Sequence, residues 1–551
     1  MKKTSLWVFC FFFVLIAVTY SNAESFKILG TRPLSMGGAY VAIAGDALTQ
    51  YWNPAGLAVG RDVDVQLPIG FQAEFTGNIL NSADRLSKLA ADYSKIGEAQ
   101  KNGKSLTLND ISAFAKGLKE LDELNKGNKG VVADISGGGD IRIKNIAVSV
   151  NNFTSIGADP TIDIKNIGLQ GGSFSPQYKA SVKMAETYNG VDLDKFITDY
   201  GVQTSATIDP SLQVSANTLS TTINDIITKL NLPISSNLDA QKIANAIINA
   251  ATDPAIAAQL GITALTAAEA KDAVAQIDEL NPLLNTILAG ATANSSYAKN
   301  NSNLTLRGAS VVECSLGYGM KVPYVQDEDV AYGIFNGLSA GLNVKYLMGY
   351  VAYKKIEVLS NDSSEAGDLF KDFKDDWEQS SAIGLDLGLL LEKRFLGRQV
   401  NFGMLLRNIN SPSFKQPLTA KNDGEGSNYT IDPQGRFGVA IWPFNWWTIS
   451  SDLDMTKNST PLPGYYSRQW GLGNEFNLVN KPWFNIALRA GVMKNLAEST
   501  SKLAYTGGFG LNLFHFVIDL GGAFSSDTVE ISSGDKIPAS ASAAATISFN
   551  F

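Results

Sequence analysis

Few residues of this chain could carry out nucleophilic, redox or metal chemistry. Outside the first 23 residues there is one cysteine, Cys314, and the whole chain has one histidine, His515. A lone cysteine allows neither an internal disulfide nor a CxxC metal or redox site. His515 could be matched with Asp519, but four residues along a strand cover about 13 Å, which is beyond hydrogen-bond reach. The sequence therefore predicts a protein that is not an enzyme and has no metal or cofactor.

Two further patterns could in principle bind a ligand. The glycine-rich stretch "SGGGD" (136–140) is not followed by a helix, so it is typical of a hairpin turn rather than of a phosphate-binding loop. The acidic run "DLFKDFKDDWE" (368–378) could hold a divalent ion, but Lys371 and Lys374 interrupt it. We interpret that run as a solvated amphipathic loop.

The first 23 residues are typical of a secretory signal peptide. Lys2 and Lys3 precede an apolar run over 6–18, and small residues follow up to Ala23. We expect cleavage near Ala23 and export of a chain that starts near Glu24. Loss of the two lysines moves the formal net charge from −8 to −10, which argues against nucleic acid as a partner.

The C-terminal stretch "SASAAATISFNF" (540–551) alternates apolar residues with small or polar ones. This period of two places Ile547, Phe549 and Phe551 on one face of a strand. A strand that ends on phenylalanine resembles the closing strand that bacterial barrels present to the barrel assembly machinery. We therefore expect Phe549 and Phe551 to serve as a membrane assembly signal.

Comparable alternation recurs along the chain and predicts an all-β fold, a transmembrane antiparallel β-barrel of about 14 strands. Short connections alternate with long polar ones, which is the plan of outer-membrane barrels, although the connection 318–337 is long on the short side. The predicted strands are 62–75, 130–138, 141–152, 304–317, 338–349, 381–393, 400–409, 434–442, 446–455, 467–477, 483–493, 504–513, 516–526 and 540–551.

Two of the long connections contain helix signals. They are a helical loop at 77–129 and a larger insert at 153–303. In the insert, Thr266 and Glu269 form a capping-box pattern, and Asp253-Pro254 and Asn281-Pro282 each place a cap before a proline. Both connections follow odd-numbered strands, so we expect them outside the cell. The predicted organisation is a signal peptide 1–23, a plug 24–61, barrel strands 62–152, a helical insert 153–303 and the remaining barrel strands 304–551.

The segment 24–61 is rich in large apolar residues and precedes the first strand. Fourteen strands enclose more space than wall side chains can fill, so we expect this segment to fold into the barrel as a plug. Its stretch "TQYWNPAGLA" (49–58) sets Tyr51 and Trp52 against an Asn53-Pro54 break. Because Pro54 removes one backbone hydrogen bond, we predict that the break lies near the wall and lets the plug yield.

A family resemblance supports this interpretation. The segment "GTRPLSMGGAYVAIAGDALTQYWNPAGLA" (30–58) resembles the N-terminus of FadL-type outer-membrane barrels for long-chain fatty acids and other hydrophobic compounds. The resemblance implies fourteen strands and an N-terminal hatch. The helical insert and "WWTISSDLDMTKN" (446–458) are more similar to barrels of the TraF type, which are linked to conjugal transfer. Another relative, the PorV-type barrel, is a secretion partner.

Together these patterns predict a protein of the bacterial outer membrane, in contact with its lipid. We expect passive uptake of a hydrophobic, fatty-acid-like small molecule through a lumen gated by the plug. The alternative is a structural or docking barrel with a partner in conjugation or protein secretion. The expected ligand and hatch residues are Met36, Gly37, Gly38, Tyr51, Trp52, Asn53, Pro54 and Ala55.

Overall fold

The structure is a computed structural model, and its described residues leave several gaps. Residues 1–21 of the predicted signal peptide, most of 77–129, Pro282 of the Asn281-Pro282 pair and most of the acidic run fall outside them. The described residues are 22–43, 45–60, 62–77, 79, 129–163, 208–230, 239–259, 263–275, 277–278, 281, 301–325, 333–357, 377–481, 483–531 and 535–551.

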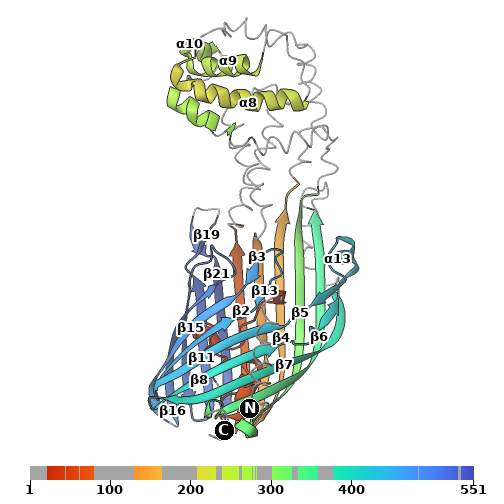
Figure 1. Cartoon of the computed structure of the whole chain (residues 1–551), viewed down its shortest axis with the longest axis vertical. Coiled ribbons are helices and arrows are strands. Elements are labelled where there is room, and N and C mark those ends of the chain that lie inside the picture. The colour runs from red at the N-terminus through yellow and green to blue at the C-terminus, as the bar shows by residue number, and fades with distance from the viewer. Residues whose placement is uncertain are drawn as a thin grey trace.

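Fourteen antiparallel strands form a closed barrel, as predicted (Figure 1). Sequence neighbours pair around the barrel, and the last strand, β21, closes it against the first, β2. The barrel strands are β2 Val63–Thr76, β3 Gly130–Ile143, β4 Ile146–Thr161, β5 Asn303–Lys321, β6 Leu338–Glu357, β7 Trp377–Phe395, β8 Arg398–Arg407, β11 Gln434–Phe444, β12 Trp447–Asp454, β15 Gln469–Lys481, β16 Phe484–Asn495, β17 Ala504–Leu513, β18 Phe516–Ser525 and β21 Ser540–Asn550.

The strands carry apolar side chains on the outer face of the barrel and polar ones on the inner face. On β18 and β21, Leu520 and Ile547 are 55% and 42% exposed, whereas Asp519 and Thr546 are 7% and 3% exposed. Soluble proteins bury their large apolar residues, whereas this barrel exposes them and buries polar ones. It is the arrangement of a barrel whose wall faces lipid and whose lumen is polar.

The glycine-rich segment 136–140 lies inside β3, so our prediction of a hairpin turn there is wrong. The chain turns later, at Lys144 and Asn145, and Lys144 has a φ of 52°. Glycines have no side chain to continue the apolar–polar alternation. A strand that contains several of them therefore looks like a turn in the sequence pattern. Their small size matters, because a Cβ on Gly138 would lie 2.2 Å from the carbonyl oxygen of Val150.

The two rims of the barrel differ. One rim, here called the short-turn rim, carries tight turns such as Lys144–Asn145, Leu396–Gly397 and Phe514–His515. The connection from β5 to β6 is a long exception on this rim, as expected from the sequence. The opposite rim, the long-loop rim, carries the longer connections, and the C-terminus lies at the short-turn end (Figure 1).

Helices lie beyond the long-loop rim, in the described part of 153–303 (Figure 1). They are α8 Gln213–Leu230, α9 Ala240–Thr252 and α10 Pro254–Gln259. Leu212, Leu219, Ala244 and Ile248 share a small apolar core there. No helix in the described ranges is both long and apolar enough to cross a membrane.

The capping pattern of this insert forms real hydrogen bonds. The Thr266 hydroxyl oxygen accepts from the Glu269 backbone N–H at 3.3 Å, and the Glu269 carboxylate accepts from the Thr266 backbone N–H at 2.8 Å. The remaining short elements of the described chain are β1 Asn22–Glu24, α2 Thr31–Ser35, α3 Thr49–Trp52, η2 Pro54–Ala58, η4 Pro210–Leu212, η6 Pro323–Val325, β9 Ser413–Lys415, α13 Leu418–Asn422, β10 Asn428–Thr430, β13 Lys457–Ser459, β14 Tyr466–Ser467, β19 Thr528–Glu530 and β20 Lys536–Pro538.

Replacement of Gly138 by alanine should destabilise the barrel by about 1–3 kcal/mol, because the new Cβ would overlap a backbone oxygen that cannot rotate away. Gly139→Ala is the matched control, since the nearest atom to its Cβ is a flexible end of Leu67 at 3.3 Å. Heat-modifiable gel migration gives the unfolding midpoint of each variant. Equal midpoints would show that packing does not constrain Gly138.

Candidate functional site

The N-terminal segment occupies the lumen of the barrel. Leu29, Met36, Trp52 and Leu57 along it are fully buried. Its helices α2 and α3 are short because glycine or proline follows each of them. Gly37 and Gly38 adopt φ values of 67° and 77° after α2, a conformation that glycine reaches without steric cost. The segment therefore folds as a compact chain of short turns.

Asn53 joins two parts of the segment to the wall. Helix α3 ends at Trp52, and Asn53 is extended, with a φ of −171°. The Asn53 side-chain oxygen accepts from the backbone N–H of Ala55 at 3.2 Å and so caps η2. Its amide nitrogen donates to the carbonyl oxygens of Val41 and of Leu389 in β7, both at 2.9 Å. The Asn-Pro break is thus hydrogen-bonded directly to the barrel wall.

A row of wall glycines makes room for this break. Gly319, Gly341 and Gly388 pair in register across β5, β6 and β7. A Cβ on Gly341 would lie 2.1 Å from the carbonyl carbon of Pro54, and one on Gly388 would lie 2.2 Å from the side-chain oxygen of Asn53. Only a wall without side chains at these positions admits the backbone of the segment so closely.

A second glycine patch receives the Met36-Gly37-Gly38 turn. A Cβ on Gly473 would lie 2.3 Å from the Met36 carbonyl oxygen, and one on Gly471 would lie 1.9 Å from that of Gly37. Gly37 is itself restricted, because its own Cβ would lie 2.4 Å from the backbone oxygen of Val492. Sequence reasoning found both motifs of the segment but not their glycine partners. Their signal in the sequence was the high glycine count within otherwise alternating strands.

Tyr51 and Trp52 form the centre of an aromatic cluster. Tyr51 stacks on Phe153 of β4 with ring centroids 5.2 Å apart, and Trp52 packs against Phe26 at 5.1 Å. Their polar tips are satisfied inside the segment. The Tyr51 hydroxyl donates to the Lys27 carbonyl at 2.6 Å, and the Trp52 indole donates to that of Leu29 at 3.0 Å. Burial raises the pKa of the Tyr51 hydroxyl, which keeps it neutral and able to donate.

Two wall arginines cover the faces of this cluster. The Arg407 guanidinium carbon lies 4.0 Å from the Tyr51 ring centroid, and that of Arg436 lies 4.1 Å from the Phe26 centroid. Each is also held by a carboxylate, Glu313 at 2.8 Å and Asp454 at 2.6 Å. Desolvated cation–π contacts of this kind are worth about 2 kcal/mol each.

An ion-pair network holds helix α2 against the opposite wall. Arg32 donates from two nitrogens to the two oxygens of Glu475 on β15, both at 2.7 Å. Arg489 on β16 donates to Glu475 at 2.6 Å and to Asp519 on β18 at 2.5 Å. Burial of these charges costs hydration energy, which the mutual pairing offsets. Sequence reasoning missed this network, although Glu475, Arg489 and Asp519 all occupy inward positions of their strands.

Two spaces flank the segment inside the lumen. Toward the long-loop rim, a narrow pocket of about 70 Å³ continues into a wide mouth of about 580 Å³. Toward the short-turn rim lies a polar space of about 650 Å³. Phe26 and Leu34 of the segment line the narrow pocket, whereas Asp46 and Leu48 line the polar space. The N-terminal segment therefore lies between the two spaces.

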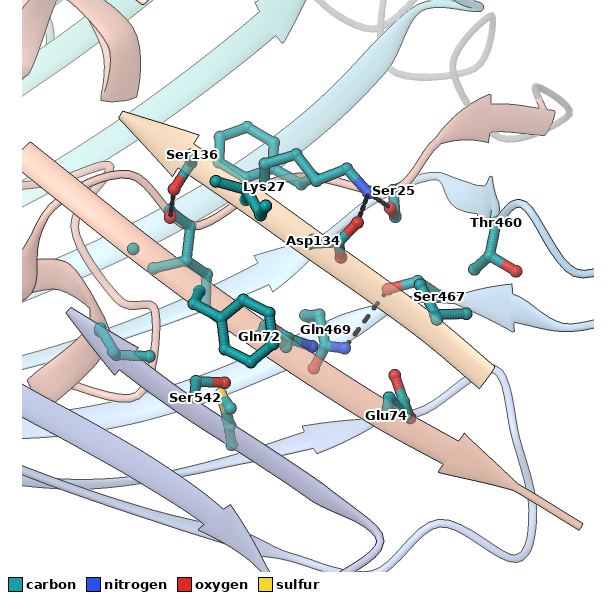
Figure 2. Close-up of a pocket in the computed structure, with 18 of the residues that line it drawn as sticks. Ser25, Lys27, Gln72, Glu74, Asp134, Ser136, Thr460, Ser467, Gln469 and Ser542 are labelled. Atoms are coloured by element: carbon teal, nitrogen blue, oxygen red, sulfur yellow. Dashed lines mark hydrogen bonds and ion pairs between the residues drawn. The ribbon is translucent and has the colours of Figure 1, made fainter. Parts of the chain in front are cut away.

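The narrow pocket combines an apolar floor with polar walls. Figure 2 shows its polar residues, among which Lys27 points to Ser25 and Asp134. The polar space near the short-turn rim is lined by asparagines instead, namely Asn445, Asn477, Asn480, Asn485, Asn512 and Asn550. The narrow pocket is thus the better site for an apolar ligand.

The remaining predicted residues lie away from the lumen. Phe549 is on the outer face of β21, and Phe551 follows that strand and stacks on His515 at 5.1 Å. His515 lies in the β17–β18 turn with Nδ1 2.5 Å from the Asn550 carbonyl oxygen, whereas Asp519 binds Arg489 inside the barrel. The two residues form no catalytic pair. No metal-binding cluster of histidine, cysteine or carboxylate residues occurs within the described residues.

Comparison with known proteins gives one family match. A family described as "F plasmid transfer operon, TraF, protein" matches residues 50–454, which is most of the chain. No curated protein matches the sequence.

Several solved structures are similar at low identity. The toluene transporter TbuX of Ralstonia pickettii shares 12% identity and a TM-score of 0.37, over 96% of this chain and 99% of its own. The toluene transporter TodX of Pseudomonas putida shares 10% identity and a TM-score of 0.37, over 96% of this chain and 99% of its own. A FadL homologue of Pseudomonas aeruginosa shares 8% identity and a TM-score of 0.38, over 96% of this chain and 100% of its own.

Glu475→Gln should loosen the N-terminal segment, because it leaves Arg32 and Arg489 without a shared buried carboxylate. Loss of one partner of a buried pair costs about 3–5 kcal/mol. Hydrogen exchange of residues 25–43 in the assembled barrel measures the effect, and we expect faster exchange. Asp527→Asn is the control, since its pair with Lys502 is long, 3.5 Å, and the lysine is 68% exposed. Unchanged exchange in Glu475→Gln would mean that the ion pairs do not hold the segment.

Proposed function

The chain belongs to the family described as "F plasmid transfer operon, TraF, protein", and on that premise we propose that it is a barrel of the bacterial outer membrane. We further propose that hydrophobic small molecules pass through its lumen and that the N-terminal segment is the hatch. The observation that carries this proposal is the contact between the segment and the narrow pocket.

The outer wall supports the membrane location. Its outward side chains are apolar, and stacked aromatic rings gather at the short-turn rim. Phe444 and Trp446 stack with centroids 5.4 Å apart, and Trp447 and Phe476 at 5.8 Å. Aromatic girdles of this kind mark the interface between hydrocarbon and water in membrane barrels.

The narrow pocket supports the binding of an apolar ligand next to the hatch. Phe26, Ile28 and Leu34 of the segment form its floor, together with Val132 and Met493 of the wall. A ligand seated there would touch the segment itself. Its binding energy could therefore favour a displaced position of the segment, which a ligand bound elsewhere in the lumen could not do directly.

The Asn53-Pro54 break supports movement of the hatch. Pro54 has no N–H to donate, so the short helices on either side are not joined by a continuous hydrogen-bond ladder. The segment could shift at this break while α3 and η2 keep their own hydrogen bonds.

A docking barrel in conjugation or secretion is the second candidate. It is favoured by the plasmid transfer operon named in the family description and by the helices held beyond the long-loop rim. Under this alternative the helices are the partner surface and the segment is a permanent stopper.

Pro54→Ala tests the hatch. We expect several-fold slower uptake of a hydrophobic compound into cells with normal membrane assembly, because alanine supplies the backbone N–H that Pro54 lacks and can stiffen the break. Pro254→Ala, at the start of α10 beyond the rim, is the matched control. Unchanged uptake in Pro54→Ala would leave the segment as a stopper, and absence of uptake in the unaltered protein would favour the docking barrel.

A further inference from the structure

We propose that the narrow pocket recognises a cationic amphiphile, with the Glu74 carboxylate binding an ammonium group and the apolar floor binding the attached chain. This inference rests on the proposed function, since it assumes that ligands enter from the wide mouth. It adds the requirement that the ligand carries a positive charge, which the uptake of neutral hydrophobic compounds does not need.

Glu74 lies where the narrow pocket meets the wide mouth. It lies near the end of β2 and lines both the narrow pocket and the wide mouth. In Figure 2 it lies apart from the group formed by Lys27, Asp134 and Ser25. Its hydrogen-bond partner among the described residues is the hydroxyl of Tyr465, a neutral donor. Among the described residues that line both the narrow pocket and the wide mouth, Glu74 is the only charged one.

The cation of the narrow pocket is committed elsewhere. Lys27 is the only lysine or arginine among the described residues that line the pocket, and Glu74 and Asp134 are the only carboxylates there. The Lys27 ammonium pairs with Asp134 at 2.8 Å and also donates to the hydroxyls of Ser25 and Ser155. Its three donors are thereby used. Lys27 and Asp134 therefore compensate each other, and Glu74 is the acidic side chain of the pocket for which the described residues show no ion pair.

The apolar floor supplies the second half of the recognition. Phe26, Ile28, Leu34 and Met493 offer a surface for an alkyl or aryl group, while the pocket is too small for a large polar head. An alkylammonium ion would place its charge against Glu74 and its chain on this floor. A fatty-acid carboxylate would instead meet like charge from Glu74, so the same pocket disfavours anions.

Three ligands of equal chain length separate the contributions of charge and chain. Octylammonium, octanol and octanoate are titrated at pH 7 against the full chain in nanodiscs, with protein-free nanodiscs subtracted. At this pH the amine is protonated. We expect octylammonium to bind at least tenfold more tightly than octanol, and octanoate more weakly than either.

Glu74→Gln should reduce octylammonium binding to the level of octanol and leave octanol binding unchanged. Glu498→Gln is the matched control, because Glu498 lines only the wide mouth. Heat-modifiable migration confirms that each variant is a folded barrel. A preference for octylammonium that survives Glu74→Gln would overturn the inference, as would equal binding of all three ligands. If the unaltered protein binds none of them, the proposed function itself fails.

Discussion

The lumen of a fourteen-stranded barrel is too wide for wall side chains to fill, and the rest of the structure follows from how that space is occupied. Here the N-terminal segment fills it. Wall side chains at the contact positions would overlap the backbone of the segment. Glycines therefore occupy these positions, Gly341 and Gly388 next to the Asn53-Pro54 break and Gly471 and Gly473 next to the Met36–Gly37 turn.

Buried polar contacts hold the segment to the wall at several points, in addition to apolar packing such as that of Tyr51 on Phe153. Arg32 with Glu475, and Asn53 with the Leu389 carbonyl, hold the segment through groups that water could also satisfy. Such hydrogen bonds fix the position of the segment on the wall, and water can replace them when the segment moves. The aromatic cluster around Trp52 gives the segment a cohesive centre of its own.

The sequence predicted the barrel well because membrane strands show their two faces through simple alternation. It failed at 136–140 for the same reason, since glycines have no side chain to show a face. The motif residues Asn53 and Pro54 were identified from backbone chemistry, which is local. The partners of the segment were not, because Arg32 and Glu475 are 443 positions apart and only closure of the barrel brings them together.

A reversible covalent lock between the segment and the wall tests the hatch most directly. Thr31 and Thr546 are suited to it, since their hydroxyl oxygens lie 2.9 Å apart. Thr31→Cys combined with Thr546→Cys, in a Cys314→Ser background, can be oxidised and reduced in the assembled barrel. If the segment is the hatch, uptake of a hydrophobic compound is lost on oxidation and returns on reduction. Equal uptake in the oxidised and reduced states would contradict it.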